Sequence, residues 1–315
     1  MARILTLLRK GIPRDREAAL LEVLDLPGDR RIVYEDSGNR DGRPVILHHG
    51  TPGSADGPKP RHSILYRLGV RLIAYCRPGY GGSSRMRGRT VARAAGDVAA
   101  LADALGLEHF GVLGRSGGGP HALATAALLP GRVTRVAALV SLAPPDAIGL
   151  DWYGDMTKDN QRSYRAASLD EELIAEQVRL RTNRVNDDPA HLLRLLREEM
   201  PQADKNVVED ETIERQLLRT YAVALGDGPY GWIDDLLALR AEWGFRFDDI
   251  RAPVRLWHGA DDRFAPVSHT RWLAEHVPRA QLEVEPGAAH FAALRVMPRM
   301  IRWLAEAGEP PSAAA

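Results

Sequence analysis

The sequence predicts an α/β fold in which a mostly parallel β-sheet is flanked by helices and interrupted by a helical cap. Short, fully apolar runs such as residues 70–76 and 136–142 alternate with segments like 90–105, where apolar residues recur at helical spacing. Strands that are apolar on both faces are typical of parallel sheets covered by helices. The alternation stops at residue 146 and resumes at Pro253.

This pattern divides the chain into an α/β core of residues 1–145 and 251–315 and a helical cap of residues 146–250. Residues rich in β-branched and apolar side chains between turn signals predict the strands. The expected strands are 31–34, 44–48, 70–76, 110–113, 136–142, 253–258 and 281–285. The expected core helices are 90–105, the segment from the glycine turn to about 129, 267–276 and 292–305.

Composition narrows the class of protein. The 315 residues are 44% hydrophobic and 27% charged with zero net charge, which is ordinary for a globular protein and argues against nucleic-acid or membrane-surface partners. Cys76 is the single cysteine, so no internal disulfide can form. The N-terminal apolar run, residues 4–8, is too short for a signal peptide, and no run is long enough to span a membrane. We expect a cytoplasmic protein.

The glycine-rich stretch GRSGGGP, residues 114–120, fits two chemistries. Residues 117–122 match the dinucleotide pattern G-x-G-x-x-A after a strand, but that pattern also needs an acidic residue about 20 positions later, and the first acid is Asp146. Residues 114–118 also match G-x-S-x-G between an apolar strand and a helix, the context of a nucleophile elbow. The second interpretation makes Ser116 a nucleophile.

A serine nucleophile needs a base and an acid that orients the base. Asp262 follows the expected strand 253–258, and His290 follows the strand 281–285, so both stand where open parallel sheets place ligands. Their order after Ser116 is serine, acid, histidine, as the elbow architecture requires. The sequence therefore predicts the catalytic residues Ser116, Asp262 and His290.

The loop after the strand 44–48 predicts an oxyanion hole. Backbone N–H groups stabilise a developing oxyanion best, and Pro52 has none, so we expect Gly117 and Thr51 to donate. The adjacent His48 and His49 would point to opposite sides of a strand and have no third ligand at suitable spacing. We expect neither a metal nor a cofactor.

The motifs resemble the α/β-hydrolase fold family over roughly residues 25–143 and 251–305. The resemblance rests on HGTPG at 49–53, RPGYGGS at 77–83, GRSGG at 114–118, GADDRFAP at 259–266 and GAAHF at 287–291. It implies a serine hydrolase most similar to the proline iminopeptidase and epoxide-hydrolase-like branch. The resemblance, rather than spacing, assigns the acid to Asp262 instead of Asp261.

The chain departs from that branch in three ways. Epoxide hydrolases carry aspartate at the nucleophile position, so Ser116 argues against epoxide hydrolysis. GRSGG and HGTPG differ from the usual iminopeptidase motifs, GGSWG and HGGPG. Arg115 stands where many relatives have histidine, and a cation under the elbow needs a carboxylate partner or solvent.

The cap should select a small-molecule substrate. Trp152 and Tyr153 follow the last strand before the cap and are the expected substrate contacts. The cap holds 23 Asp and Glu against 13 Lys and Arg, which would steer cations to the site or simply form a solvated helical face.

We expect cleavage of an ester, amide or related carbonyl bond through an acyl-enzyme. The alternatives are an iminopeptidase-like aminopeptidase, a C–C bond hydrolase, a lyase or transferase on the same triad, and a ligand receptor with little turnover.

Overall fold

A computed structural model describes residues 3–5, 21–306 and 308, and within them the strands form one nine-stranded sheet. The strands are β1 (Arg3–Leu5), β2 (Leu21–Leu26), β3 (Arg30–Gly38), β4 (Arg43–His48), β5 (Val70–Tyr75), β6 (Phe110–Arg115), β7 (Val133–Leu139), β8 (Val254–Gly259) and β9 (Ala280–Glu285). Their order is β1-β2-β3-β5-β4-β6-β7-β8-β9. β1, β2, β3 and β5 pair antiparallel, and the pairs from β5 to β9 are parallel.

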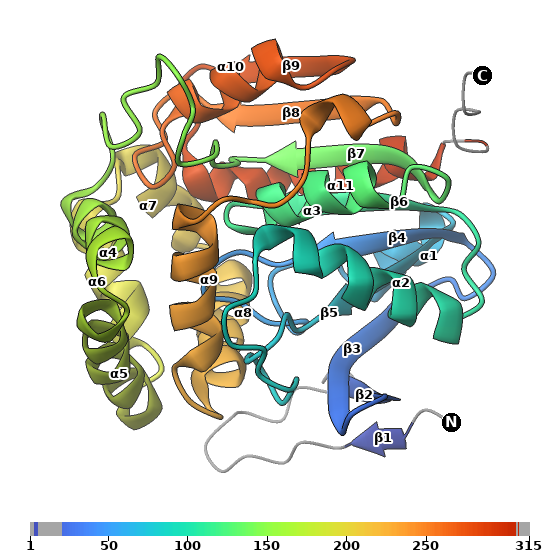
Figure 1. Cartoon of the computed structure of the whole chain (residues 1–315), viewed down its shortest axis with the longest axis horizontal. Helices are drawn as coiled ribbons and strands as arrows, with labels where there is room; N and C mark the ends of the chain where they lie inside the picture. The colour runs from blue at the N-terminus through green and yellow to red at the C-terminus, as the bar shows by residue number, and fades with distance from the viewer. Residues whose placement is uncertain (1–2, 6–20, 307, 309–315) are drawn as a thin grey trace.

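Helices cover both faces of the sheet (Figure 1). α1 (His62–Arg67) and α11 (Ala293–Ala305) lie on one face, and α2 (Ala94–Ala104), α3 (Gly118–Leu128) and α10 (Val267–His276) lie on the other. Side chains alternate between the faces, as the pleat requires. Val45 and Leu47 of β4 pack toward α11, whereas Ile46 packs toward α2 and α3.

The helices between β7 and β8 form a layer at one end of the sheet (Figure 1). They are α4 (Lys158–Leu169), α5 (Glu171–Asp187), α6 (His191–Glu199), α7 (Gln202–Val208), α8 (Glu211–Leu225) and α9 (Tyr230–Arg240). Asp170 and Asp210 cap the first turns of α5 and α8 by accepting hydrogen bonds from backbone N–H groups. No strand occurs within residues 146–250, as the sequence pattern predicts. None of the helices described is both long and apolar enough to cross a bilayer.

The fold class predicted from the alternation of strands and helices is confirmed, with two differences in detail. The sequence pattern missed β1 and β2, which are short and pair antiparallel at the sheet edge. Most of the N-terminal segment assessed for a signal peptide lies outside the described residues. The strand expected over 136–142 occupies 133–139 instead, because Val140 adopts a left-handed backbone with φ 46° and ends the extended run.

Candidate active site

Ser116 sits on a sharp turn between β6 and α3. Its φ of 55° lies in the left-handed region, which a non-glycine residue rarely occupies. The Ser116 N–H donates to the Leu139 carbonyl of β7, and the Ser116 carbonyl accepts from the Gly119 N–H, at 2.9 and 2.8 Å. The surrounding backbone thus fixes the strained conformation and presents the hydroxyl at the end of the strand.

The glycines on either side of Ser116 are required by close backbone contacts. A Cβ on Gly114 would lie 2.3 Å from the Gly118 carbonyl oxygen, and one on Gly118 would lie 2.2 Å from the His48 carbonyl oxygen. A side chain at Gly114 would push the end of β6 away from the start of α3, and one at Gly118 would push α3 away from β4. The G-x-S-x-G spacing therefore has a steric cause in this chain.

Asp262 and His290 lie together, as the sequence predicts. Nδ1 of His290 is 2.8 Å from Oδ2 of Asp262, and both side chains are buried. Because Asp262 accepts, Nδ1 carries the proton and Nε2 keeps a free lone pair. The loop after β8 thus orients the imidazole that the loop after β9 supplies.

The Asp262 carboxylate is held in its charged form. Oδ1 accepts from the backbone N–H groups of Phe264 and Ala265 at 2.8 and 3.0 Å, and Nε2 of His258 lies 3.1 Å from Oδ2. Burial acts to raise the pKa of Asp262, but the charge of His290 and the hydrogen bonds from His258 and His290 outweigh it and hold the pKa well below its ordinary value. An ionised acid next to the base is what a triad requires.

Ser116 and His290 line one cavity between the sheet and the helical layer. The lining residues outside the helical layer are Gly50, Thr51, Pro52, Arg115, Ser116, Leu142, Phe264, Ala265, His290 and Phe291. Those from the helical layer are Asp159, Asn160, Ser163, Tyr164, Arg181, Leu192, Leu196, Tyr221, Trp232 and Leu236. Within the described residues no hydrogen bond joins Ser116 to His290, and such contacts commonly tighten only when substrate binds.

The two expected oxyanion donors are neighbours. A Cβ built on Gly117 would lie 2.3 Å from Oγ1 of Thr51, so only glycine fits beside the loop after β4. Neither backbone N–H finds an acceptor within the described parts of the chain. The carbonyl of Gly117 is also fixed, because Nδ1 of His121 donates to it at 2.7 Å. Two free N–H groups beside Ser116 can receive a developing negative charge.

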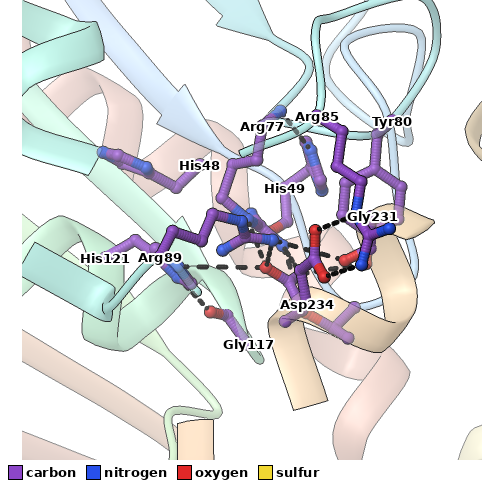
Figure 2. Close-up of polar contacts among 12 residues, drawn as sticks. His48, His49, Arg77, Tyr80, Arg85, Arg89, Gly117, His121, Gly231 and Asp234 are labelled. Carbon is purple, nitrogen blue, oxygen red and sulfur yellow. Dashed lines mark hydrogen bonds and ion pairs between the residues drawn. The ribbon is translucent and has the colours of Figure 1, made fainter. Parts of the chain in front are cut away.

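A buried carboxylate that sequence analysis missed supports this loop. Asp235 of α9 accepts from the Thr51 hydroxyl at 2.6 Å and binds the guanidinium groups of Arg77 and Arg89, each at 2.5 Å. Figure 2 shows Arg77, Arg89 and Tyr80 directed at this helix. Burial acts to raise the pKa of Asp235, but the two guanidiniums outweigh it and hold the pKa far below its ordinary value. Nothing in the sequence selects Asp235 as the partner of Arg77 and Arg89.

A second missed carboxylate holds the histidine loop. Asp204 of α7 accepts from the backbone N–H groups of His290 and Phe291 at 3.2 and 2.7 Å. Burial raises the pKa of Asp204 to about 6, although the His290 charge and the Phe291 N–H pull it downward. No local pattern in the sequence indicates this contact, because Asp204 is one of many acidic residues in the helical segment.

Trp152 and Tyr153, the expected substrate contacts, are not among the lining residues. The Trp152 indole is buried, donates from Nε1 to the Ala143 carbonyl at 2.9 Å, and packs edge-to-face on Tyr164 with ring centroids 4.9 Å apart. The ring of Tyr153 lies under the guanidinium of Arg165, 4.1 Å away. Tyr164, which does line the cavity, is therefore backed by Trp152.

The other residues singled out by sequence analysis are His48, His49, Cys76 and Arg115. His48 and His49 make internal hydrogen bonds: His48 with Tyr75, and His49 with the Gly50 carbonyl at 2.7 Å. Cys76 is fully buried, and burial raises the pKa of its thiol to about 12. Arg115 is largely buried and lines the cavity, and no carboxylate within the described residues pairs with it.

Comparison with known proteins places the chain among hydrolases. The family model of the alpha/beta hydrolase fold matches residues 43–295. A bifunctional esterase/perhydrolase of Acinetobacter calcoaceticus is 26% identical over 262 residues, which cover 82% of this chain and 89% of the relative. A non-heme chloroperoxidase of Streptomyces lividans is 43% identical over 122 residues, only 38% of this chain and 44% of the relative.

A solved structure shows the same fold. The enol-lactonase of Burkholderia xenovorans superposes with a TM-score of 0.65 at 20% identity, covering 89% of this chain and 97% of that one. At this identity the likeness concerns the fold alone. The narrower iminopeptidase and epoxide-hydrolase-like branch stays a prediction.

Proposed function

We propose that this chain, which belongs to the alpha/beta hydrolase fold family, hydrolyses an ester, amide or related carbonyl bond of a small molecule by a Ser-His-Asp triad. The 2.8 Å contact between Asp262 and His290, at a cavity that Ser116 also lines, carries the proposal. The positive φ of Ser116 supports it, because a strained turn that exposes one hydroxyl has no packing purpose.

The chemistry follows from the protonation states. Oγ of Ser116 attacks the carbonyl carbon while Nε2 of His290 takes the hydroxyl proton. The ionised Asp262 keeps the proton of Nδ1 in place and stabilises the imidazolium that forms. The imidazolium then gives its proton to the leaving group, and an acyl-enzyme results. Water, deprotonated by His290, attacks the acyl carbon and releases the acid and Ser116.

The tetrahedral intermediates carry their charge on the former carbonyl oxygen. We assign its two donors to the backbone N–H groups of Gly117 and Thr51, residues that contact each other and whose N–H groups lack other acceptors among the described residues. Thr51 owes its place to Asp235, so that carboxylate is a positioning residue that acts through the loop.

Residues 1–145 and 251–315 form the catalytic core in this proposal, and residues 146–250 form the cap that selects the substrate. Half of the cavity lining comes from helices of the cap, which supports that division. The enclosed site suits a small molecule better than a polymer. The single, buried Cys76 is consistent with a reducing, cytoplasmic location.

The test is active-site labelling. Wild-type protein and Ser116→Ala are incubated with a fluorophosphonate, and the intact mass is measured. One adduct on the wild type that maps to Ser116 and is absent from Ser116→Ala supports the proposal. His290→Ala should label far more slowly than the wild type, because the hydroxyl then lacks its base.

Two outcomes would overturn it. Absence of labelling at Ser116, even with a small probe such as a methyl fluorophosphonate, would mean that the serine is not activated and would favour a ligand receptor. Labelling without turnover of esters or amides would favour the C–C hydrolase, lyase or transferase alternatives, and a screen of dicarbonyl metabolites would then decide among them.

A further inference from the structure

Arg115 is the last residue of β6 and directly precedes Ser116. Its side chain is 9% exposed and lines the cavity beside the serine. The guanidinium lies against the loop that carries Thr51, because a Cβ built on Gly50 would stand 3.2 Å from Nη2 of Arg115. The charged group thus lies against the loop of the proposed oxyanion hole, in the cavity that Ser116 also lines.

Arg115 has no counter-ion. Within the described residues its guanidinium takes part in no hydrogen bond and no ion pair. The other two buried arginines, Arg77 at 1% and Arg89 at 6% exposed, both bind Asp235. Burial lowers the pKa of Arg115, and Tyr221 is the one group that acts in the other direction. A guanidinium nevertheless keeps its charge at any physiological pH, so the cavity holds an uncompensated cation.

The other charges of the cavity cancel. Arg181 and Asp159 form a two-pronged ion pair at 2.6 and 2.8 Å, and His290 is bound to Asp262. Asp159 is the one carboxylate among the lining residues. The acidic excess of the cap therefore does not make this cavity anionic, and the cavity has one positive charge to offer a ligand.

Tyr221 of α8 supplies a second donor near Arg115. It lines the same cavity, and its hydroxyl has no hydrogen-bond partner among the described residues. Burial raises the pKa of Tyr221 to about 12, partly offset by the charge of Arg115, so the hydroxyl is protonated at neutral pH and can donate.

We propose that Arg115, assisted by Tyr221, binds a carboxylate of the substrate, so that the preferred substrates are small esters, lactones or amides that carry a carboxylate. The inference rests on the proposed role of Ser116 as nucleophile. A guanidinium binds a carboxylate through two parallel hydrogen bonds, which fix orientation as well as position. A substrate anchored there would have its carbonyl presented to the adjacent serine, and its charge would neutralise the buried cation.

The first experiment compares charged and neutral substrates of equal shape. Monomethyl esters of C4 to C6 dicarboxylic acids are assayed beside the corresponding methyl ester amides, in which a carboxamide replaces the carboxylate. The wild type should favour the charged ester in kcat/KM. Arg115→Met should lower that charged-to-neutral ratio by about 10- to 100-fold, the loss expected for a charged hydrogen-bonded contact. Arg115→Lys should lower it less.

The matched control deletes one positive and one negative charge, so the net charge of the cavity stays the same. The double variant Asp159→Asn with Arg181→Met deletes both members of the neutral pair in the same cavity. It should keep the charged-to-neutral ratio of the wild type. A ratio that is unchanged in Arg115→Met, or that falls equally in the double variant, would overturn the proposal.

A binding measurement separates this inference from the proposed catalysis. Glutarate is titrated calorimetrically into Ser116→Ala and into Ser116→Ala with Arg115→Met, and binding should be lost only in the second. Without ligand, Arg115→Met should raise the Tm, because it removes an uncompensated buried charge; a guanidinium with a purely structural role would leave a less stable protein. If Ser116 proves unreactive but glutarate binding still depends on Arg115, the catalytic proposal fails and the anion site stands. If both proteins bind glutarate equally, the anion site fails whatever the serine does.

Discussion

Thr51 and Asp235 are 184 residues apart in the chain, and the Thr51 hydroxyl donates a 2.6 Å hydrogen bond to Oδ2 of Asp235. Asp235 is fully buried in α9 and also binds Arg77, Arg89 and the hydroxyl of Tyr80. A carboxylate of the cap helices thus holds both the loop beside the serine and the two arginines under it. The geometry of the proposed oxyanion hole therefore depends on a residue of α9, which belongs to the proposed cap.

Asp235→Asn should be strongly destabilising. It leaves two buried guanidiniums without their shared counter-ion, and breaking a buried ion pair from one side costs about 3–5 kcal/mol in the free energy of unfolding. Urea denaturation measures this loss. The neighbouring Asp234→Asn is the control: its partner Arg85 is 31% exposed, so we expect a loss of about 1 kcal/mol. Equal losses for the two variants would contradict the shared-anchor interpretation.

Asp262→Asn should lower kcat by about 10³- to 10⁴-fold, because an amide cannot hold His290 in the tautomer that leaves Nε2 free. Steady-state hydrolysis of an accepted ester measures the effect. Asp261→Asn is the matched control, since that side chain is exposed and stands one residue away. A similar loss in Asp261→Asn would mean that the acid of the triad has been misassigned.

Asp204 should make stability depend on pH. Its pKa rises from an ordinary 3.8 to about 6 on folding, so the folded protein binds this proton more tightly than the unfolded chain does. The stabilising contribution is complete below about pH 4 and is lost as the pH rises through 6, by up to about 3 kcal/mol. Denaturation at pH 5 and pH 7 should show a smaller difference in Asp204→Asn than in the wild type. An identical difference in both proteins would exclude Asp204 as the group responsible.

The glycines of the turn should separate folding from activity. Gly118→Ala drives a Cβ into the His48 carbonyl at 2.2 Å, which cannot move without the strand, so the protein should lose several kcal/mol or fail to fold. Gly117→Ala would displace Thr51, whose Oγ1 and Cβ lie 2.3 and 2.9 Å from the added Cβ; because Thr51 stands in a loop and not in a strand, the main loss should be in kcat. Gly96→Ala, exposed in α2 with nothing within 4 Å, should stabilise by about 0.5–1 kcal/mol. Thermal melting and ester hydrolysis, measured on all three, would contradict this order if Gly117→Ala unfolded first.

Local patterns predicted the fold and pointed to the proposed triad, because the signals for both lie in short stretches of sequence. The apolar strands, the glycines around Ser116 and the loops of Asp262 and His290 each stand next to the residues that give them their place. Sequence analysis missed Asp204 and Asp235 because their partners are 86 and 158 residues away in the chain. Nothing near either aspartate distinguishes it from the exposed acids of the same helices.

The sequence also could not predict the direction in which a side chain points. Trp152 follows the last strand before the cap, which suggested a substrate contact, but its indole turns to the Ala143 carbonyl and packs behind Tyr164. For Arg115 the sequence indicated the need for a carboxylate or solvent; among the described residues no carboxylate pairs with it, and its side chain lines the cavity instead. The direction in which a side chain leaves its backbone depends on neighbours that only the folded chain defines.

Two helices of the proposed cap hold the two loops of the proposed reaction centre: α7 holds the His290 loop through Asp204, and α9 holds the Thr51 loop through Asp235. The cap therefore cannot be exchanged for that of a relative as a self-contained cassette, since a graft would remove both anchors at once. A chimera that retains α7, α8 and α9 and replaces α4, α5 and α6 would change about a third of the residues that line the cavity and keep the proposed catalytic groups in place. In laboratory evolution, new selectivity should accordingly accumulate in α4 to α6 while the two aspartates stay fixed.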